Sequence, residues 1–328
     1  MKLGSLKSAK SLDGELVVVS RDNKKAVKVP QIASSLREAV EKWSLVEKDL
    51  LKISDDLNAG RAAQAFEVNE ADLHSALPRT WLFADGSAFI HHIKLVRMAR
   101  KAELPATLST VPLMYQGECG GFLAPTEDIP QVDFSHGTDF EGEVGVITDF
   151  VPMGISSEEA LKRIRLFILI NDVSLRGLIP EELAQGFGFF QSKPASALSP
   201  FAVTADELGE AWKDGRIHLP LEVNFNGTFF GKANAKDMFF HFGQLISHAA
   251  KTRNLAAGSI IGSGTVSNED MSMGSSCLAE KRTLEQIHEG KITTPFMKEG
   301  DTIEMKMRNT KGENIFGTIF QKVRSVKK

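Results

Sequence analysis

Apolar and polar positions divide the chain into an amino-terminal part and a longer remainder. Short apolar runs at 16–20 and 26–29, on either side of a polar turn, predict two strands. Between Ala33 and about Ala65 apolar residues recur every three or four positions, which predicts helix, and Asn58-Ala59-Gly60 is a typical helix end. We therefore expect a small strand-and-helix module over residues 1–75.

The remainder, residues 76–328, is expected to form a larger domain dominated by strands. The continuous apolar run at 165–170 predicts a strand that is buried on both faces. Apolar runs predict further strands at 259–261, 302–307 and 315–320.

One hairpin and two helices complete the pattern. Asn226-Gly227 between apolar runs is a strong signal for a two-residue hairpin loop. Ser156 and Glu159 have the spacing of a capping box, so a short helix is expected over 156–162. An amphipathic stripe predicts another helix from Asp237 to about Arg253. Because long helices do not alternate regularly with strands, we expect a β-rich α+β fold and not a doubly wound sheet.

Two glutamates stand on one predicted strand, 139–147. Side chains alternate faces along a strand, so Glu141 and Glu143 point the same way, with Cβ atoms roughly 6–7 Å apart. Two carboxylates at that separation can close on one hard cation such as Mg²⁺, Mn²⁺ or Ca²⁺. The alternative is an edge strand with a solvated acidic face.

Asp172 ends the predicted strand at 165–170. It either caps the turn that follows or contributes a carboxylate to a site that its rigid strand holds in place. Together, Glu141-x-Glu143 and Asn171-Asp172-x-Ser174-x-Arg176 closely resemble the fumarylacetoacetate hydrolase family. The resemblance implies a mixed β-sandwich roll, assembled as a homodimer, whose divalent metal is held by Glu141, Glu143 and Asp172.

Asp85 and His92 stand upstream of the glutamates. In fumarylacetoacetases an Asp and a His at this spacing supply a fourth metal ligand and the catalytic base, so the resemblance gives these roles to Asp85 and His92. A histidine suits the role of a base because its ordinary pKa of about 6.5 lies near neutrality. An amphipathic helix over 88–100 would account for His92 without any catalytic role.

Four further residues gain roles from the same resemblance. Glu280 would orient His92, Thr265 and Arg176 would bind a substrate carboxylate, and Lys193 would contact a substrate oxygen. The chain departs from the family pattern at Ile179, where fumarylacetoacetases keep a glutamine that contacts substrate. This departure weakens the case for fumarylacetoacetate itself as the substrate.

Composition and charge narrow the classes of partner. With 42% hydrophobic residues and a formal net charge of −3, the 328-residue chain has the composition of a globular protein and no feature that calls for nucleic acid or an anionic membrane. No apolar run is long enough for a membrane span and the first residues lack a secretory signal, so we expect a cytoplasmic protein. Two cysteines are too few for a disulfide framework.

The resemblance predicts a metal-dependent hydrolase that cleaves a C–C bond in a β-diketo or 2-oxo acid, as in aromatic amino-acid catabolism. The same site could instead decarboxylate, hydrate or isomerise a 2-oxo acid. A metal-free hydrolase is a distant alternative, because Gly117-Glu-Cys119-Gly-Gly121 fits a nucleophile elbow but is not followed by a helix signal. A binding module that has lost catalysis is the third.

Overall fold

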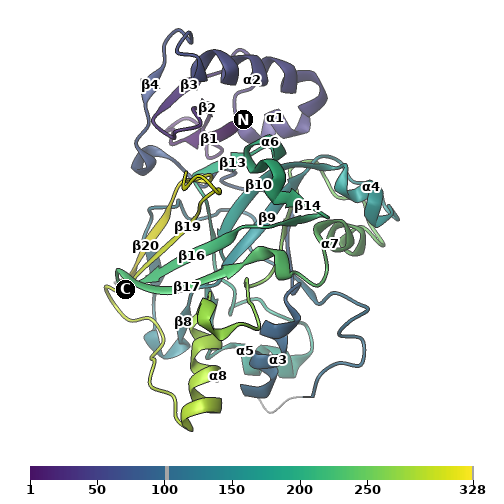
Figure 1. The fold of residues 1–328 in the computed structure, drawn as a ribbon, viewed down its shortest axis with the longest axis vertical. Helices are drawn as coiled ribbons and strands as arrows, with labels where there is room; N and C mark the ends of the chain where they lie inside the picture. The colour runs from purple at the N-terminus through teal and green to yellow at the C-terminus, as the bar shows by residue number, and fades with distance from the viewer. Residues whose placement is uncertain (100–102, 327–328) are drawn as a thin grey trace.

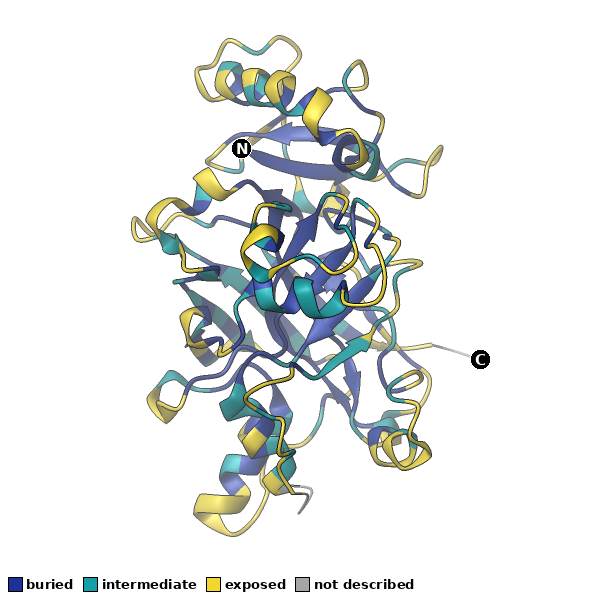
Figure 2. Cartoon of the chain, turned by 90° about the vertical axis from the view of Figure 1, so that its right-hand side faces the viewer, coloured by how far each residue is buried: buried dark blue, intermediate teal, exposed yellow. Residues whose placement is uncertain are grey.

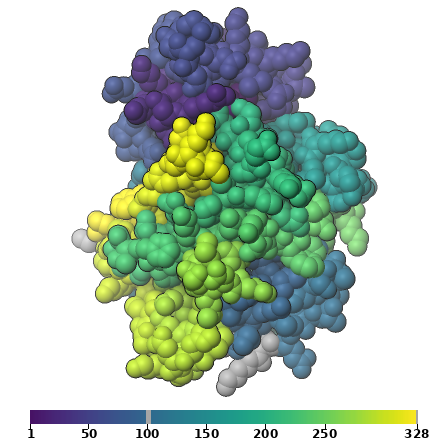
Figure 3. All heavy atoms as spheres, viewed as in Figure 1, coloured from purple at the N-terminus to yellow at the C-terminus, as the bar shows by residue number. Residues whose placement is uncertain are grey.

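Two β-sheets organise the computed structural model, which describes residues 1–99 and 103–326. The molecule is elongated, and its amino-terminal residues form one end, as the ribbon and the space-filling view both show (Figure 1, Figure 3). The mixed, sheet-rich α+β fold confirms the predicted fold class. Among the described residues no helix is long and apolar enough to cross a membrane.

The larger sheet has eleven strands and passes through the centre of the molecule. β18 pairs in parallel with β5 and antiparallel with β9, so three segments far apart in sequence lie side by side. The strand order is β4 (Phe66–Glu67), β3 (Lys25–Lys28), β2 (Glu15–Val19), β1 (Lys2–Leu6), β13 (Phe201–Val203), β10 (Ile164–Asn171), β9 (Gly142–Thr148), β18 (Ile260–Gly262), β5 (Phe83–Gly86) and β6 (Met114–Gln116), with β12 (Ala197–Leu198) also paired to β10.

The second sheet has five strands and packs on the first through a shared apolar core. A Cβ at Gly142 of β9 would lie 2.9 Å from the Leu221 side chain of β16, so glycine at this position lets the two sheets approach closely. The strand order is β17 (Thr228–Asn234), β16 (Pro220–Phe225), β19 (Thr302–Met307), β20 (Ile319–Ser325) and β7 (Ile129–Gln131). Two short pairs complete the strands: β8 (Thr138–Asp139) with β11 (Ser174–Leu175), and β14 (Trp212–Lys213) with β15 (Arg216–Ile217).

Helices lie around the sheets and are mostly short. The α-helices are α1 (Leu36–Glu41), α2 (Trp43–Asn58), α3 (Ile90–Ala99), α4 (Ser157–Leu161), α5 (Ile179–Gln185), α6 (Ala205–Leu208), α7 (Phe242–Ala249) and α8 (Leu278–Glu289). Single 3₁₀ turns occur at Glu70–Asp72, Phe134–His136, Gly209–Ala211, Ala235–Asp237 and Met271–Met273. Helices α3, α5 and α8 lie at the end of the molecule opposite the amino-terminal residues (Figure 1).

Several local predictions are confirmed. β10 is buried along its apolar run. Asn226 and Gly227 join β16 to β17 with φ values of 52° and 72°, as a type I′ turn requires. Ser156 caps α4 by accepting a hydrogen bond from the backbone N–H of Glu159. The predicted helix at 88–100 is α3; Arg100 itself lies outside the described residues.

Three local predictions are wrong in their bounds. The helix expected from Asp237 begins at Phe242, because His241 and Gln244 form a capping box there, and it ends at Ala249. The strand expected at 315–320 begins at Ile319, since Gly317 has a φ of +73° that interrupts extended backbone.

The third concerns the strand expected at 139–147, which is split at Phe140-Glu141. β8 pairs with β11, whereas β9 pairs with β10 and β18, so the chain changes sheet between Asp139 and Gly142. Glu141 therefore stands at the junction of two sheets and not within a regular strand.

The amino-terminal strands continue the main sheet, because β1 pairs with β13. Leu3, Val18 and Trp43 share one apolar core with Leu166 and Ile168 of β10, and the buried strands run from one end of the molecule toward the other (Figure 2). A separate module over 1–75 and a catalytic domain over 76–328 therefore stay a prediction.

Candidate active site

A single cavity of about 370 Å³ gathers most of the predicted site residues. Seven of the nine line it: Asp85, His92, Glu141, Glu143, Arg176, Lys193 and Thr265. The other two lie behind the cavity wall, where Asp172 hydrogen-bonds to Lys193 and Glu280 to His92. The structure thus brings together residues that are up to 195 positions apart, from Asp85 to Glu280.

Three acidic residues form a buried group that could hold a metal ion. Asp85 lies on β5, Glu143 on β9 and Asp172 just after β10, and one carboxylate oxygen of each lies within 4.8 Å of the others. The pairing of β5, β18, β9 and β10 in one sheet creates this proximity. All three residues are at most 5% exposed.

The charges of this group are not balanced by the protein alone. Both carboxylate oxygens of Glu143 are buried and have no hydrogen-bond partner among the described residues. Burial, together with the negative charge of Asp85, raises the pKa of Glu143 well above its usual value. Burial and the charge of Asp172 raise the pKa of Asp85 to about 7. Such clustered carboxylates need either protons or a cation.

The space around the group also fits a small cation. A Cβ at position 262 would lie 2.3 Å from Oδ1 of Asp85 and 3.2 Å from Oε2 of Glu143, so Gly262 leaves room for both carboxylates. Their oxygens are the hard ligands that Mg²⁺, Mn²⁺ and Ca²⁺ prefer. The residues present therefore fit a divalent metal.

Glu141, the remaining predicted metal ligand, contacts two cationic side chains instead of the acidic group. Its Oε2 lies 2.5 Å from Nζ of Lys193, and its Oε1 lies 2.6 Å from Nη2 of Arg176. Burial opposes its charged form, but these two cations hold its pKa well below the usual range. Glu141 is thus charged and paired, in contrast to Glu143.

Lys193 joins Glu141 to the acidic group. Its ammonium lies 2.6 Å from Oδ2 of Asp172 and donates to Oγ of Ser174 at 2.8 Å. All three of its N–H groups therefore have protein acceptors. In this arrangement Lys193 positions two carboxylates, and a substrate oxygen would have to replace one of its acceptors.

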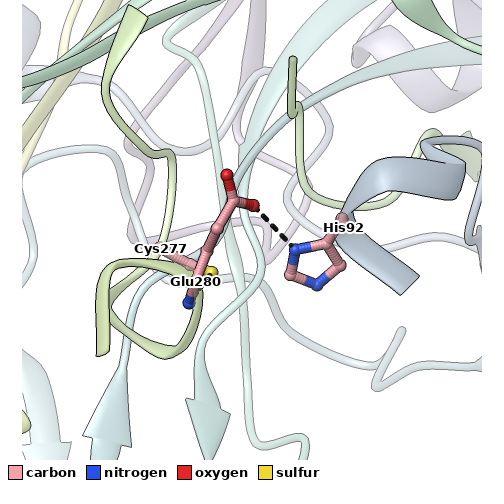
Figure 4. Close-up of side chains that lie close together, drawn as sticks. All are labelled: His92, Cys277 and Glu280. Carbon is pink, nitrogen blue, oxygen red and sulfur yellow. Dashed lines mark hydrogen bonds and ion pairs between the residues drawn. The ribbon is translucent and has the colours of Figure 1, made fainter. Parts of the chain in front are cut away.

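His92 is oriented by a buried carboxylate. Its Nδ1 lies 3.0 Å from Oε2 of Glu280, and the other oxygen of Glu280 accepts a hydrogen bond from Ser267 at 3.1 Å. Figure 4 shows His92 approaching from α3 and Glu280 from the first turn of α8, with the thiol of Cys277 beside it. Because Nδ1 faces a carboxylate, it holds the proton and leaves Nε2 as the basic nitrogen.

Arg176 and Thr265 both line the cavity, but the contacts of Arg176 differ from those expected of a substrate-binding residue. Its Nε donates to Oδ2 of Asp139 at 2.8 Å, in addition to its bond to Glu141.

Cys119 does not line this cavity, and burial together with the charge of Glu118 raises the pKa of its thiol. That environment gives no support to a nucleophilic cysteine.

Sequence reasoning missed residues that hold the site together. Tyr115, the only tyrosine in the chain, donates to Asp172 at 2.7 Å, and Ser196 donates to the other oxygen of Asp172. Asp139 accepts hydrogen bonds from the backbone N–H groups of Leu278 and Ala279 at the start of α8. The rarity of tyrosine was the one signal available; Ser196 and Asp139 are ordinary residue types that only the fold brings to the site.

A buried carboxyl group without a hydrogen-bond partner among the described residues, such as Glu143, is costly inside a fold and would weaken a purely structural core. Beside it stands a histidine with a fixed tautomer, so the class of protein that this fold and site define is an enzyme. Comparison with known proteins gives the family. Residues 82–324 match the fumarylacetoacetate hydrolase C-terminal domain, and residues 1–79 match fumarylacetoacetase N-terminal domain 2. The chain belongs to the fumarylacetoacetate hydrolase family.

The similar proteins carry the names of different enzymes, two hydrolases and a tautomerase. The chain is 28% identical over 212 residues to a 2,4-didehydro-3-deoxy-L-rhamnonate hydrolase of Sphingomonas, covering 64% of this chain and 72% of the relative. It is 23% identical over 261 residues to an oxaloacetate tautomerase of Bacillus subtilis, covering 78% and 83%. The crystal structure of maleylpyruvate hydrolase from Sphingobium shares the fold, with a TM-score of 0.67 and 14% identity over 99% of this chain and 100% of that one.

Proposed function

We propose that this protein is a divalent-metal-dependent hydrolase that cleaves the C–C bond of a β-diketo acid of the acylpyruvate type. The observation that carries the proposal is the position of His92, with its Nε2 free, in the same cavity as the acidic group of Asp85 and Glu143. Asp85, Glu143 and Asp172 would hold a divalent cation, which would supply Lewis-acid stabilisation of negative charge. The names of related hydrolases support the reaction class.

In this reaction His92 accepts a proton from water at Nε2. The hydroxide adds to the distal carbonyl carbon of the substrate, the bond to the neighbouring carbon breaks, and its electron pair forms the enolate of pyruvate. The proton on Nε2 is then available to the enolate carbon, which completes a 2-oxo acid and a carboxylic acid. Glu280 at Nδ1 and Glu141, whose Oε1 lies 4.0 Å from Nε2, stabilise the imidazolium between the two transfers.

The other charged residues keep these groups in place. Arg176 and Lys193 hold Glu141, and Lys193 also holds Asp172. Thr265, which is 2% exposed and lines the cavity, is the proposed contact for the substrate carboxylate.

The test is the loss of the enol absorbance of acetylpyruvate, with Mg²⁺ or Mn²⁺ and again after EDTA. We expect turnover that EDTA abolishes and added metal restores, with acetate and pyruvate in equal amounts. Turnover that is indifferent to EDTA would refute the metal-dependent mechanism.

A second candidate is proton transfer alone, as in a tautomerase or isomerase. It is favoured by the similarity to the oxaloacetate tautomerase, which covers more of the chain than the similarity to the hydrolase. His92 could move a proton between carbon and oxygen without activating water. The same assay separates the two when acetate is measured, because tautomerisation only speeds the approach to keto–enol equilibrium and releases no acetate.

A further inference from the structure

The cavity has two chemically different ends. Its acidic residues Asp85, Glu141 and Glu143 are at most 5% exposed, whereas Leu183 is 43% exposed and Val96 is half-buried. The charged side of the cavity is therefore buried, and the apolar side chains extend from the buried Ile179, which is 1% exposed, to Leu183 at the solvent. Six side chains from three segments form this apolar wall: Ile93, Val96, Leu113, Met114, Ile179 and Leu183.

Of the three lysine and arginine residues among the described residues that line the cavity, two are paired with carboxylates. Lys193 and Arg176 are bound to the buried carboxylates described above. Arg97 is the one other lysine or arginine among the described residues that line the cavity, and its Nη1 donates to the backbone carbonyl of Glu103 at 2.7 Å. The apolar wall thus offers no buried cation to a second carboxylate on the far end of a substrate.

Ile179 is the most buried of the six apolar side chains in this wall. It begins α5, is 1% exposed and lines the cavity. Its side chain offers apolar surface and no hydrogen-bonding group. A charged or hydroxylated group placed against it would lose hydration without gaining a partner.

We infer that the site accepts a 2-oxo acid whose far end is an apolar chain and not a second carboxylate. This inference rests on the proposed function for the position of the 2-oxo acid head, which lies at the buried acidic end. The tail then lies along the apolar wall. Each methylene buried there should raise affinity about fourfold.

The test is calorimetric titration of the Mg²⁺-loaded protein with 2-oxobutanoate, 2-oxohexanoate, 2-oxooctanoate and the dicarboxylate 2-oxoadipate. We expect affinity to rise about fourfold per methylene across the first three. 2-Oxoadipate, with the same chain length as 2-oxohexanoate, should bind at least about tenfold more weakly. A flat series, no binding by any of the four, or tighter binding of 2-oxoadipate would overturn the inference. In the last case, loss of that binding in Arg97→Met would identify its partner.

Variants of the wall provide a second test. Ile179→Gln should lower the ratio of the affinities for 2-oxooctanoate and 2-oxobutanoate at least about fivefold, because the amide disrupts the apolar wall. Leu183→Gln, at a position that already reaches solvent, should lower the ratio in the same direction and leaves the buried core unchanged. The matched control is Leu45→Gln on α2, where leucine is 77% exposed, and its ratio should equal that of the wild type. Unchanged ratios in both wall variants would overturn the inference.

Failure of this inference and of the proposed function can be told apart. Metal-dependent hydrolysis of acetylpyruvate with no gain in affinity along the 2-oxo acid series would leave the function standing and refute the apolar tail. A clear gain along the series with no turnover of any acylpyruvate would refute the hydrolase and keep the apolar ligand class.

Discussion

Replacing Glu143 with glutamine should stabilise the metal-free protein and remove its response to metal. Glu143 is fully buried, its oxygens have no hydrogen-bond partner among the described residues, and Asp85 and Asp172 lie nearby. At pH 8 its carboxyl group is either charged and repelled, or it holds a proton that the unfolded chain does not bind. Because the folded-state pKa is raised, both states cost stability above the ordinary pKa of a glutamate.

The size of the effect follows from the geometry. Two unit charges 4.8 Å apart repel by about 3 kcal/mol at an effective dielectric constant of about 20. A glutamine at this position removes that repulsion, and its amide can donate to Asp85. With an unfolding entropy of about 2.1 cal/mol/K per residue, a 328-residue chain gains roughly 4 °C in Tm from 3 kcal/mol.

Metal should stabilise the wild type and leave the Tm of Glu143→Gln almost unchanged. At a concentration of about 1,000 times Kd, Mg²⁺ stabilises the wild type by about 4 kcal/mol, or roughly 6 °C. Glu143→Gln lacks one of three carboxylates, so its Tm should rise by less than about 1 °C under the same conditions. Differential scanning calorimetry in EDTA and in Mg²⁺ measures both shifts.

Glu141→Gln is the matched control. It is the same substitution two residues away, but it removes one of the two carboxylates that pair with each of Lys193 and Arg176. Breaking such pairs costs about 3–5 kcal/mol, so this variant should lose Tm in EDTA. If Glu143→Gln also loses Tm in EDTA, or if Mg²⁺ stabilises it as much as the wild type, the assignment of a metal to this group is refuted.

Three further predictions concern the metal site, the base and the rejected nucleophile. Gly262→Ala should weaken Mg²⁺ binding at least about tenfold in a titration, because its Cβ would displace Asp85. The control is Gly121→Ala, whose Cβ meets nothing within 4 Å and which should bind Mg²⁺ as the wild type does. Glu280→Gln should lower kcat about 100- to 10,000-fold with little change in KM, since it no longer fixes the tautomer of the base; a change confined to KM would contradict this role. Cys119→Ser should keep kcat within about twofold of the wild type, and its inactivation would restore the thiol mechanism.

The local signals in the sequence were strong where one segment decides its own structure. The apolar run of β10 specifies a buried strand because side chains on both of its faces are apolar, and either face would be unfavourable in contact with water. Asn226-Gly227 specifies its hairpin because few other residue pairs adopt two positive φ angles in succession. The family resemblance then supplied what no local pattern could, namely the pairing of distant acidic residues with His92.

Local signals failed where another part of the fold competed. The helix predicted from Asp237 starts five residues later, because the side chains of His241 and Gln244 bond to the backbone and fix the first turn there. Glu141 was expected to share a strand face with Glu143. Both line the cavity, but the chain changes sheet between Asp139 and Gly142, and one glutamate meets cations while the other meets carboxylates.

By itself the sequence determined the fold class and several of the longer strands, because these depend on periodicity and on residue type, and the family resemblance supplied the set of candidate site residues. Only the tertiary structure decided which of those residues contact one another, and therefore which carboxylates are paired with cations. Asp139 holds both the start of α8 and Arg176, and Arg176 holds Glu141. This chain of contacts joins the helix that carries Glu280 to the acidic group. The charge of each carboxylate is set by neighbours tens of positions away along the chain, such as Lys193 for Glu141 and Asp85 for Glu143, and no local pattern encodes those distances.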